Sequence, residues 1–261
     1  MDHSNQPMLT ILGPAKTIDM SPHGVTDHHS MPLYLDQAEA LVDQLRGYSL
    51  AQLKSLMKVS DKLATLTFER YASWRKSYTA AEGQQAILAF SGEVFNGLKA
   101  RTLKKEDLLF AQEHVRILSG LYGVLKPLDL ILPYRLEIGT KMKNPGGNNL
   151  YEFWKAIIPE EIARATGKQI PPVLINLASN EYYKSILPGT FPHTTITPVF
   201  KESHGTGFRN VTIYAKKARG MMLRFIIRNR IKEPEYLKAF DEEGYYFNNN
   251  LSNQKEWVFC R

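Results

Sequence analysis

The segment PVLINL, residues 172–177, and the ASNE that follows it decide the fold predicted for this chain. The run is apolar up to Asn176, which is typical of a strand buried in the centre of a sheet. The polar residues after it start a helix, and open α/β sheets bind ligands where a strand ends and a helix begins. We therefore expect an α/β fold with a pocket at this edge. Its candidate residues are Asn176, Ser179, Glu181 and Tyr182, although Ser179 could equally be a plain N-cap.

Shorter apolar runs and helical repeats predict the rest of the fold. Further strands are expected at residues 8–12, 86–90, 195–200, 210–215, 245–248 and 256–260. Helices are expected at residues 33–46, after the caps Ser49 and Ser60, and at residues 102–118, 150–165, 214–230 and 234–240. The chain shows no internal repeat and no convincing linker. We read residues 1–261 as one α/β (α+β) domain with a mixed central sheet flanked by helices.

The segment YAKKARGMMLRFIIRNR, residues 214–230, concentrates the positive charge of the chain. The chain carries a net charge of +7, and the remainder is nearly neutral without this segment. An apolar side makes the segment part of the fold, so its charges have fixed positions and repel one another unless an anion is close. We expect the segment to bind an anion, although a solvated basic helix is the simpler alternative. The charged residues are Lys216, Lys217, Arg219, Arg224, Arg228 and Arg230.

The segment SGLYG, residues 119–123, predicts a turn between two helices. The first helix would end at Gly120, and the second would begin near Pro127. This outline is typical of a helix–hairpin–helix element, in which glycines let backbone N–H groups contact phosphate. Lys126 would lie beside it. The glycines are three residues apart instead of the usual two, so an ordinary helix–turn–helix corner remains an equal alternative.

Several classes of protein are excluded or disfavoured by the residues present. Cys260 is the only cysteine, which excludes a disulfide framework and a two-thiol redox mechanism within one chain. His23, His28 and His29 lie in one loop, and we interpret them as exposed histidines instead of metal ligands. We expect no metal and no cofactor. The chain has no secretory signal and no apolar run long enough to span a membrane, so we expect a soluble cytoplasmic protein.

A pocket that contains lysine is predicted if the strands that precede Lys16, Asn176 and Lys216 are parallel neighbours. Lys16 follows the first strand, and Lys216 follows the strand expected at residues 210–215. Parallel strands would bring both lysines to the edge that carries Asn176 and Glu181. The alternative is that Lys16 pairs with a nearby acid and the others cap helices. The candidates for catalysis are Lys16, Asp61, Glu181 and Lys216, although helix capping alone accounts for Asp61.

The motifs of this chain resemble those of the YaaA family of bacterial peroxide-stress proteins. The resemblance covers essentially the whole chain and implies a cytosolic protein that binds DNA and limits free iron during hydrogen peroxide stress. It also implies an unusual fold with a helix–hairpin–helix element and a positively charged cleft. GPAKT stands here where SPAKT is usual in the family, so a hydroxyl is missing beside Lys16. The motifs are GPAKTID, KVSDKLA, AILAFSGEVFNGL, ILSGLYGVLKPLDLILPYRLEIG, LYEFWK, INLASNEYYKSI and YAKKARGMMLRFII.

Three hypotheses for function follow. The first is non-sequence-specific or structure-selective binding of the DNA backbone through Lys216, Lys217, Arg219, Arg224, Arg228 and the hairpin at Gly120 and Gly123. The second is an enzyme acting on a nucleotide or on damaged DNA, in which a pocket lysine forms a Schiff base with an abasic sugar. The third is a scaffold whose basic face binds an acidic protein. Lys16, Glu181 and Lys216 lining one deep pocket would favour the enzyme, whereas a broad open groove would favour binding.

Overall fold

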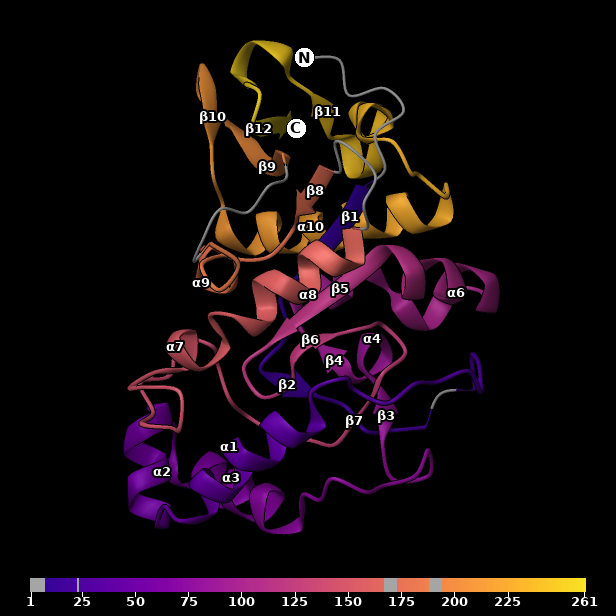
Figure 1. Cartoon of the computed structure of the whole chain (residues 1–261). Coiled ribbons are helices and arrows are strands. Elements are labelled where there is room, and N and C mark those ends of the chain that lie inside the picture. Colours follow the sequence, from indigo (N-terminus) through magenta and orange to yellow (C-terminus); the bar gives the residue numbers. More distant parts are fainter. Residues whose placement is uncertain (1–7, 23, 167–172, 188–193) are drawn as a thin grey trace.

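A mixed sheet forms the centre of the protein in the computed structural model, which describes residues 8–22, 24–166, 173–187 and 194–261 (Figure 1). The strand order is β11-β12-β9-β8-β1-β5-β6, and β10 pairs with β9. Five strands are parallel, and β6, β10 and β11 pair antiparallel with their neighbours. The predicted α/β fold with a mixed sheet is therefore confirmed. The bounds are β1 Met8–Leu12, β5 Val115–Ser119, β6 Gly123–Leu125, β8 Val173–Asn176, β9 Thr194–His204, β10 Gly207–Arg209, β11 Tyr246–Phe247 and β12 Glu256–Cys260.

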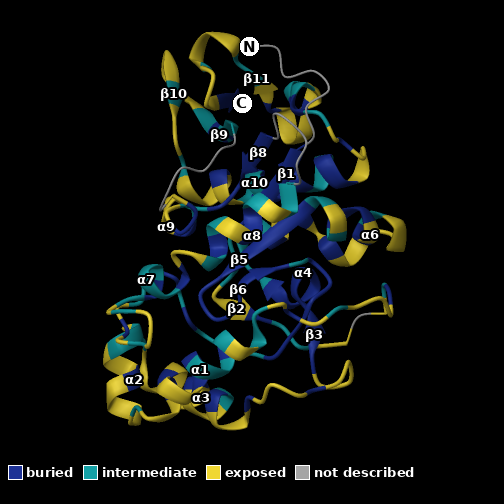
Figure 2. Ribbon diagram, viewed as in Figure 1, coloured by how far each residue is buried: buried dark blue, intermediate teal, exposed yellow. Residues whose placement is uncertain are grey.

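Strands β8, β1 and β5 are neighbours in the sheet and are buried along their whole length (Figure 2). Leu9 of β1 lies opposite Leu174 of β8, and Leu12 lies opposite Ile117 of β5. Strands covered on both faces need apolar side chains on both, which is why these runs show no alternation. The central buried strand predicted at residues 172–177 is confirmed at Val173–Asn176, with Leu177 just after its end and residue 172 outside the described residues.

Helices surround the sheet, and α1, α2 and α3 gather at the lower end of the molecule (Figure 1). Ser49 and Gln52 form the predicted capping box of α2, and Ser60 caps α3. Two small sheets, β2-β4 and β3-β7, lie between this group and the main sheet. The helices are α1 Leu35–Arg46, α2 Leu50–Met57, α3 Asp61–Ser73, α4 Ala86–Ala89, α5 Glu93–Leu98, α6 Lys105–His114, α7 Leu150–Trp154, α8 Ile157–Thr166, α9 Asn180–Tyr183 and α10 Thr212–Arg228. The remaining strands are β2 Thr17–Ile18, β3 Gln84–Gln85, β4 Phe90–Ser91 and β7 Leu130–Ile131, and the short 3₁₀ helices are η1 Ala100–Thr102, η2 Pro234–Ala239, η3 Glu242–Gly244 and η4 Asn249–Leu251.

The basic helix α10 packs against α5 with very close backbones. A Cβ atom added to Gly220 would lie 1.7 Å from the carbonyl oxygen of Val94, and one added to Gly97 would lie 2.0 Å from that of Lys217. Glycine at both positions permits this approach. The contact fixes the rotation of α10, and with it the direction in which each charged side chain of the helix points.

Three predicted elements are wrong. Residues 86–90 form the buried helix α4 followed by β4, and not a strand. The helix predicted at residues 102–118 ends at His114, because Val115–Ser119 pairs with β1 as β5. The strand predicted at residues 210–215 is replaced by β10, residues 207–209, and by the start of α10. Short apolar runs suit a buried helix and a buried strand equally, so their partners decide the outcome.

The helix–hairpin–helix expected around residues 118–128 is also wrong. This segment is a buried β-hairpin in which Leu118 of β5 faces Val124 of β6. Gly120 packs so closely that an added Cβ atom would lie 2.3 Å from the carbonyl oxygen of Leu136. Gly123 has a φ of 68°, and its Cα faces the ring of Trp154. Both glycines are therefore explained by packing and backbone conformation. A tight turn between two helices occurs instead between α2 and α3, where Lys58 has a φ of 50°.

Among the helices of the described ranges, none is both long and apolar enough to cross a bilayer.

Candidate functional site

A cavity of about 460 Å³ lies beside the carboxyl ends of β1 and β8. Because these two strands are parallel neighbours, the loops that follow them meet at one edge of the sheet. The loop after β1 contributes Lys16, and the start of α9 contributes Ser179, Glu181 and Tyr182. The second turn of α10 contributes Lys216 and, three residues later, Arg219. Residues far apart in the sequence therefore share one small cavity.

Two candidates do not line this cavity. Asn176 is buried at the end of β8, where its Oδ1 accepts a hydrogen bond from the Ala178 N–H at 3.0 Å and its amide donates to Thr197. Asp61 forms an ion pair with Lys54 at 2.7 Å, which links α3 to α2. Asn176 therefore supports the loop that leads into α9, whereas Asp61 lies on the surface in an exposed ion pair.

Lys16 is paired with an acid. This pairing was one of the two alternatives predicted from the sequence. Its Nζ lies 2.8 Å from Oε2 of Glu137, and Arg135 lies 3.5 Å from the other oxygen of the same carboxylate. Arg135 and Glu137 both line the cavity and were missed from the sequence. The alternation in Tyr134–Ile138, where apolar side chains are buried and charged ones are half-buried, is the signal that could have found them.

The wall formed by α9 is held by hydrogen bonds to the neighbouring segment. The Gly139 N–H donates to Oε1 of Glu181 at 3.2 Å, and the Ile138 N–H donates to the Tyr182 hydroxyl at 3.4 Å. The Tyr151 hydroxyl donates to the backbone carbonyl of Glu181 at 2.9 Å. Burial raises the pKa of Tyr182 well above its ordinary value, so its phenol remains neutral.

Arg219 brings an uncompensated charge to the cavity. Its side chain is partly buried, and it forms no hydrogen bond or ion pair with any described residue. Burial lowers the pKa of the guanidinium, because desolvation disfavours the charged form. Lys216 lies on the same face of α10, is exposed, and likewise forms no ion pair with a described residue. The cavity thus has an unneutralised positive side.

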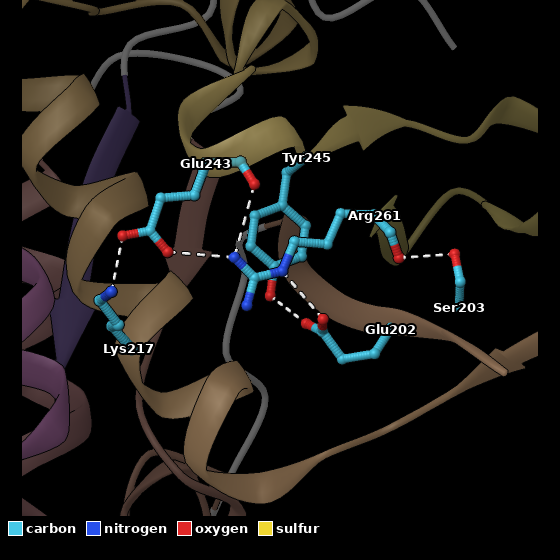
Figure 3. A network of polar contacts seen from close by, with 6 residues as sticks. All are labelled: Glu202, Ser203, Lys217, Glu243, Tyr245 and Arg261. Carbon is cyan, nitrogen blue, oxygen red and sulfur yellow. Dashed lines mark hydrogen bonds and ion pairs between the residues drawn. The ribbon is translucent and has the colours of Figure 1, made fainter.

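Lys217, by contrast, belongs to a polar network (Figure 3). Its Nζ lies 2.6 Å from Oε1 of Glu243, and the other carboxylate oxygen of Glu243 lies 3.0 Å from Arg261. Arg261 also pairs with Glu202 at 2.8 Å, and the Tyr245 hydroxyl donates to Glu202 at 2.5 Å. These contacts hold α10 against β9, η3 and the last strand.

The remaining charged residues of α10, Arg224 and Arg228, lie further along the helix than the cavity residues Lys216 and Arg219. Arg224 donates to the backbone carbonyls of Leu98 and Lys99 at 3.1 and 3.2 Å, which satisfies the C-terminal end of α5. Arg228 is exposed near the end of the helix. The segment is therefore not one continuous basic face.

A second cavity of about 390 Å³ adjoins the first and shares four residues with it, Lys16, Arg135, Glu137 and Glu181. It adds Lys58, from the turn after α2, and Lys141. The Nε atom of Arg135 is buried without a hydrogen-bond partner in the described structure. The two cavities form one cleft, which we call the basic cleft.

Within the described ranges, no three His, Cys, Asp or Glu side chains lie close enough together to hold a metal ion. His28 and His29 are exposed in their loop, and His23 lies outside the described residues. The polar side chains that line the cleft carry ammonium, guanidinium, carboxylate and hydroxyl groups.

The fold and the cleft define an α/β protein with a basic cavity at the carboxyl edge of a mixed sheet. Comparison with protein families assigns the chain to one family. The family described as peroxide stress protein YaaA matches residues 8–251, and the chain belongs to this family. The resemblance found in the sequence motifs is confirmed, and with it a role in peroxide stress.

Proposed function

We propose that this protein acts in peroxide stress by binding DNA through its phosphate groups in the basic cleft. The observation that carries the proposal is the charge of the cleft. Six cationic side chains line it against three carboxylates, so its net charge is positive. The cations are Lys16, Lys58, Arg135, Lys141, Lys216 and Arg219, and the acids are Glu93, Glu137 and Glu181.

The contacts of α10 decide which of its charges bind phosphate best. Lys216 and Arg219 face the cleft without an acidic partner among the described residues, so an anion compensates them fully. The charged groups of Lys217 and Arg224 already have partners within the fold, and phosphate would have to compete with these. Contacts to phosphate carry no base information, so the binding is independent of sequence. DNA binding by the family, as the motif resemblance implies, supports the same reading.

The test is binding of fluorescent duplexes of two unrelated sequences by the wild type and by the double variant Lys216→Ala/Arg219→Ala. We expect the double variant to lose at least tenfold in affinity on both duplexes. Lys255→Ala is the control, because it removes one exposed charge in a turn outside the cleft. Equal affinity of the wild type and the double variant would reject the cleft as the DNA site.

A second candidate function is chemistry on a nucleotide or on damaged DNA. The specific observation in its favour is that Lys16, Glu181 and Lys216 line the same cavity. Lys216 is the better nucleophile of the two lysines, because Lys16 is held by Glu137. Its neutral amine would attack the aldehyde carbon of an open abasic sugar, and the carbonyl oxygen would leave as water to give a Schiff base.

Borohydride trapping tests this chemistry, because hydride reduces the Schiff base to a stable amine that links protein and DNA. We expect the wild type and Lys16→Ala to form the adduct on abasic DNA, and Lys216→Ala to form none. If the wild type forms no adduct, the second candidate fails while the binding function is untouched.

A further inference from the structure

The apolar side of the 460 Å³ cavity is as well defined as its charged side. Three nearly buried aromatic side chains line it. They are Phe95 of α5, Tyr182 of α9, and Tyr134 from the segment after β7, which are 6%, 7% and 4% exposed. Phe90 packs against both Phe95 and Tyr134, with ring centroids 5.5 and 6.4 Å away. Side chains fixed in this way form a wall that exists before any ligand arrives. A volume of this size is typical of sites for small molecules.

The opposite side of the cavity, formed by Arg219 and Lys216, favours the binding of an anion. A partly buried guanidinium without a partner is costly, because desolvation is not repaid by a hydrogen bond or by an opposite charge. Arg219 has several N–H donors in one plane, which match two oxygens of a phosphate. Lys216, one turn away on the same face, adds a second charge for the same group.

From these two sides we propose that the cavity binds one nucleoside monophosphate unit, either free or as an unpaired nucleotide of a DNA strand. Arg219 and Lys216 hold the phosphate, and the base lies against the wall of Phe95, Tyr134 and Tyr182. The carboxylates of Glu93 and Glu181, which also line the cavity, accept hydrogen bonds from sugar hydroxyl or base amino groups. This inference deepens the proposed function, on which it rests, by naming the unit that enters the site.

The apolar wall is what selects a nucleotide over simpler phosphates. Inorganic phosphate or a sugar phosphate satisfies Arg219 but carries no base to lie against the aromatic wall. A base lying against this wall buries apolar surface, which neither a phosphate nor a sugar does to the same extent. A base inside a duplex cannot reach such a wall without leaving the stack, which costs free energy.

Calorimetric titration of the full chain with four probes tests the proposal. The probes are dAMP, deoxyadenosine, deoxyribose 5-phosphate and inorganic phosphate. We expect dAMP to bind at least tenfold more tightly than each of the other three. Inorganic phosphate or deoxyribose 5-phosphate binding as tightly as dAMP would overturn the role of the wall. Deoxyadenosine binding as tightly as dAMP would overturn the proposal that Arg219 and Lys216 bind the phosphate.

Variants of Arg219 test whether α10 binds the phosphate of dAMP. Arg219→Ala should weaken dAMP binding at least tenfold, and Arg219→Lys, which keeps the charge but loses the planar fork, should recover part of it. Lys255→Ala should bind dAMP like the wild type. Thermal unfolding of each variant shows whether it is folded, and the Arg219→Lys variant keeps the test valid if Arg219→Ala is not. Unchanged dAMP affinity in folded Arg219→Ala or Arg219→Lys would overturn the assignment.

Duplex binding measured on the same samples separates this inference from the proposed function. Duplex binding without dAMP binding would overturn the nucleotide site and leave the DNA-binding function standing. The converse result, dAMP binding without any DNA binding, would reject the DNA function and support the nucleotide site.

Discussion

Lys217 and Arg219 lie two residues apart on α10 and have opposite electrostatic surroundings. Glu243 compensates Lys217 at 2.6 Å, whereas Arg219 faces the cavity with no acidic partner among the described residues. Helical spacing places Lys217 and Arg219 on different faces of the segment, but it does not tell which of the two faces meets an acid. Glu243 lies 26 residues further along the chain and reaches Lys217 only through the fold. The charge that matters for binding is therefore set by distant contacts.

The burial of the Asp129 carboxyl predicts that the stability of the protein depends on pH. The carboxyl is buried, and although it accepts hydrogen bonds from the Ser30 hydroxyl and the Lys126 N–H, burial dominates and raises its pKa to about 6. Arg116 and Lys126 lower this pKa without reversing the shift. Because the folded state favours the protonated acid, this contribution to stability is complete below about pH 4 and is lost as the pH rises through about 6.

We expect the wild type to lose up to about 3 kcal/mol more of its unfolding free energy between pH 4 and pH 7 than Asp129→Asn does. Urea unfolding of both proteins across this range measures the difference. Parallel curves for the two proteins would show that Asp129 has an ordinary pKa.

Cys260 predicts that protection against peroxide does not depend on a thiol in this chain. The side chain is buried in β12, and burial raises the pKa of the thiol, so little reactive thiolate forms. Cys260→Ala should protect cells lacking the natural protein as well as the wild type does, in a survival assay after hydrogen peroxide. Loss of protection at equal protein level would indicate thiol chemistry with another molecule.

At the scale of elements, the contact between α5 and α10 predicts a large effect of a small substitution. In Gly220→Ala the new methyl group would lie 1.7 Å from the backbone oxygen of Val94, so the helices must move apart. We expect a loss of about 3 kcal/mol in the free energy of unfolding, the upper end of the usual cost of overpacking. Urea unfolding measures it. Gly207→Ala is the control, because its new methyl group meets no atom within 4 Å and should change stability by less than about 0.5 kcal/mol.

Elements with a clear local signal could be predicted from the sequence. Met8–Leu12 and Glu256–Cys260 were predicted at the residues where they occur, and Ser49 caps α2 as expected. The failures are short apolar runs whose partners are remote. Val115–Ser119 looks like the end of a helix until β1 provides a strand to pair with. The turn glycines Gly120 and Gly123 likewise suggested a phosphate-binding hairpin, whereas Leu136 and Trp154 explain them.

At the scale of the whole molecule, the order of the strands explains which site residues could be predicted. Lys16 and Glu181 were expected together because they follow strands that are parallel neighbours, and that reasoning holds. Lys216 reaches the cavity by another route, since it lies in the second turn of α10 and not after a strand. Arg135 and Glu137 come from an irregular segment, for which no rule of sheet topology applies.

The central claim is that the cleft cations, and not the basic run as a whole, bind phosphate. The most direct measurement is the salt dependence of duplex binding for the neighbouring variants Lys216→Ala and Lys217→Ala, with Arg219→Ala beside them. Each phosphate contact contributes about 0.9 to the slope of log affinity against log salt concentration. We predict that Lys216→Ala and Arg219→Ala each flatten the slope by about that amount, while Lys217→Ala leaves it almost unchanged. Equal flattening by all three variants, or a change in Lys217→Ala alone, would contradict this account.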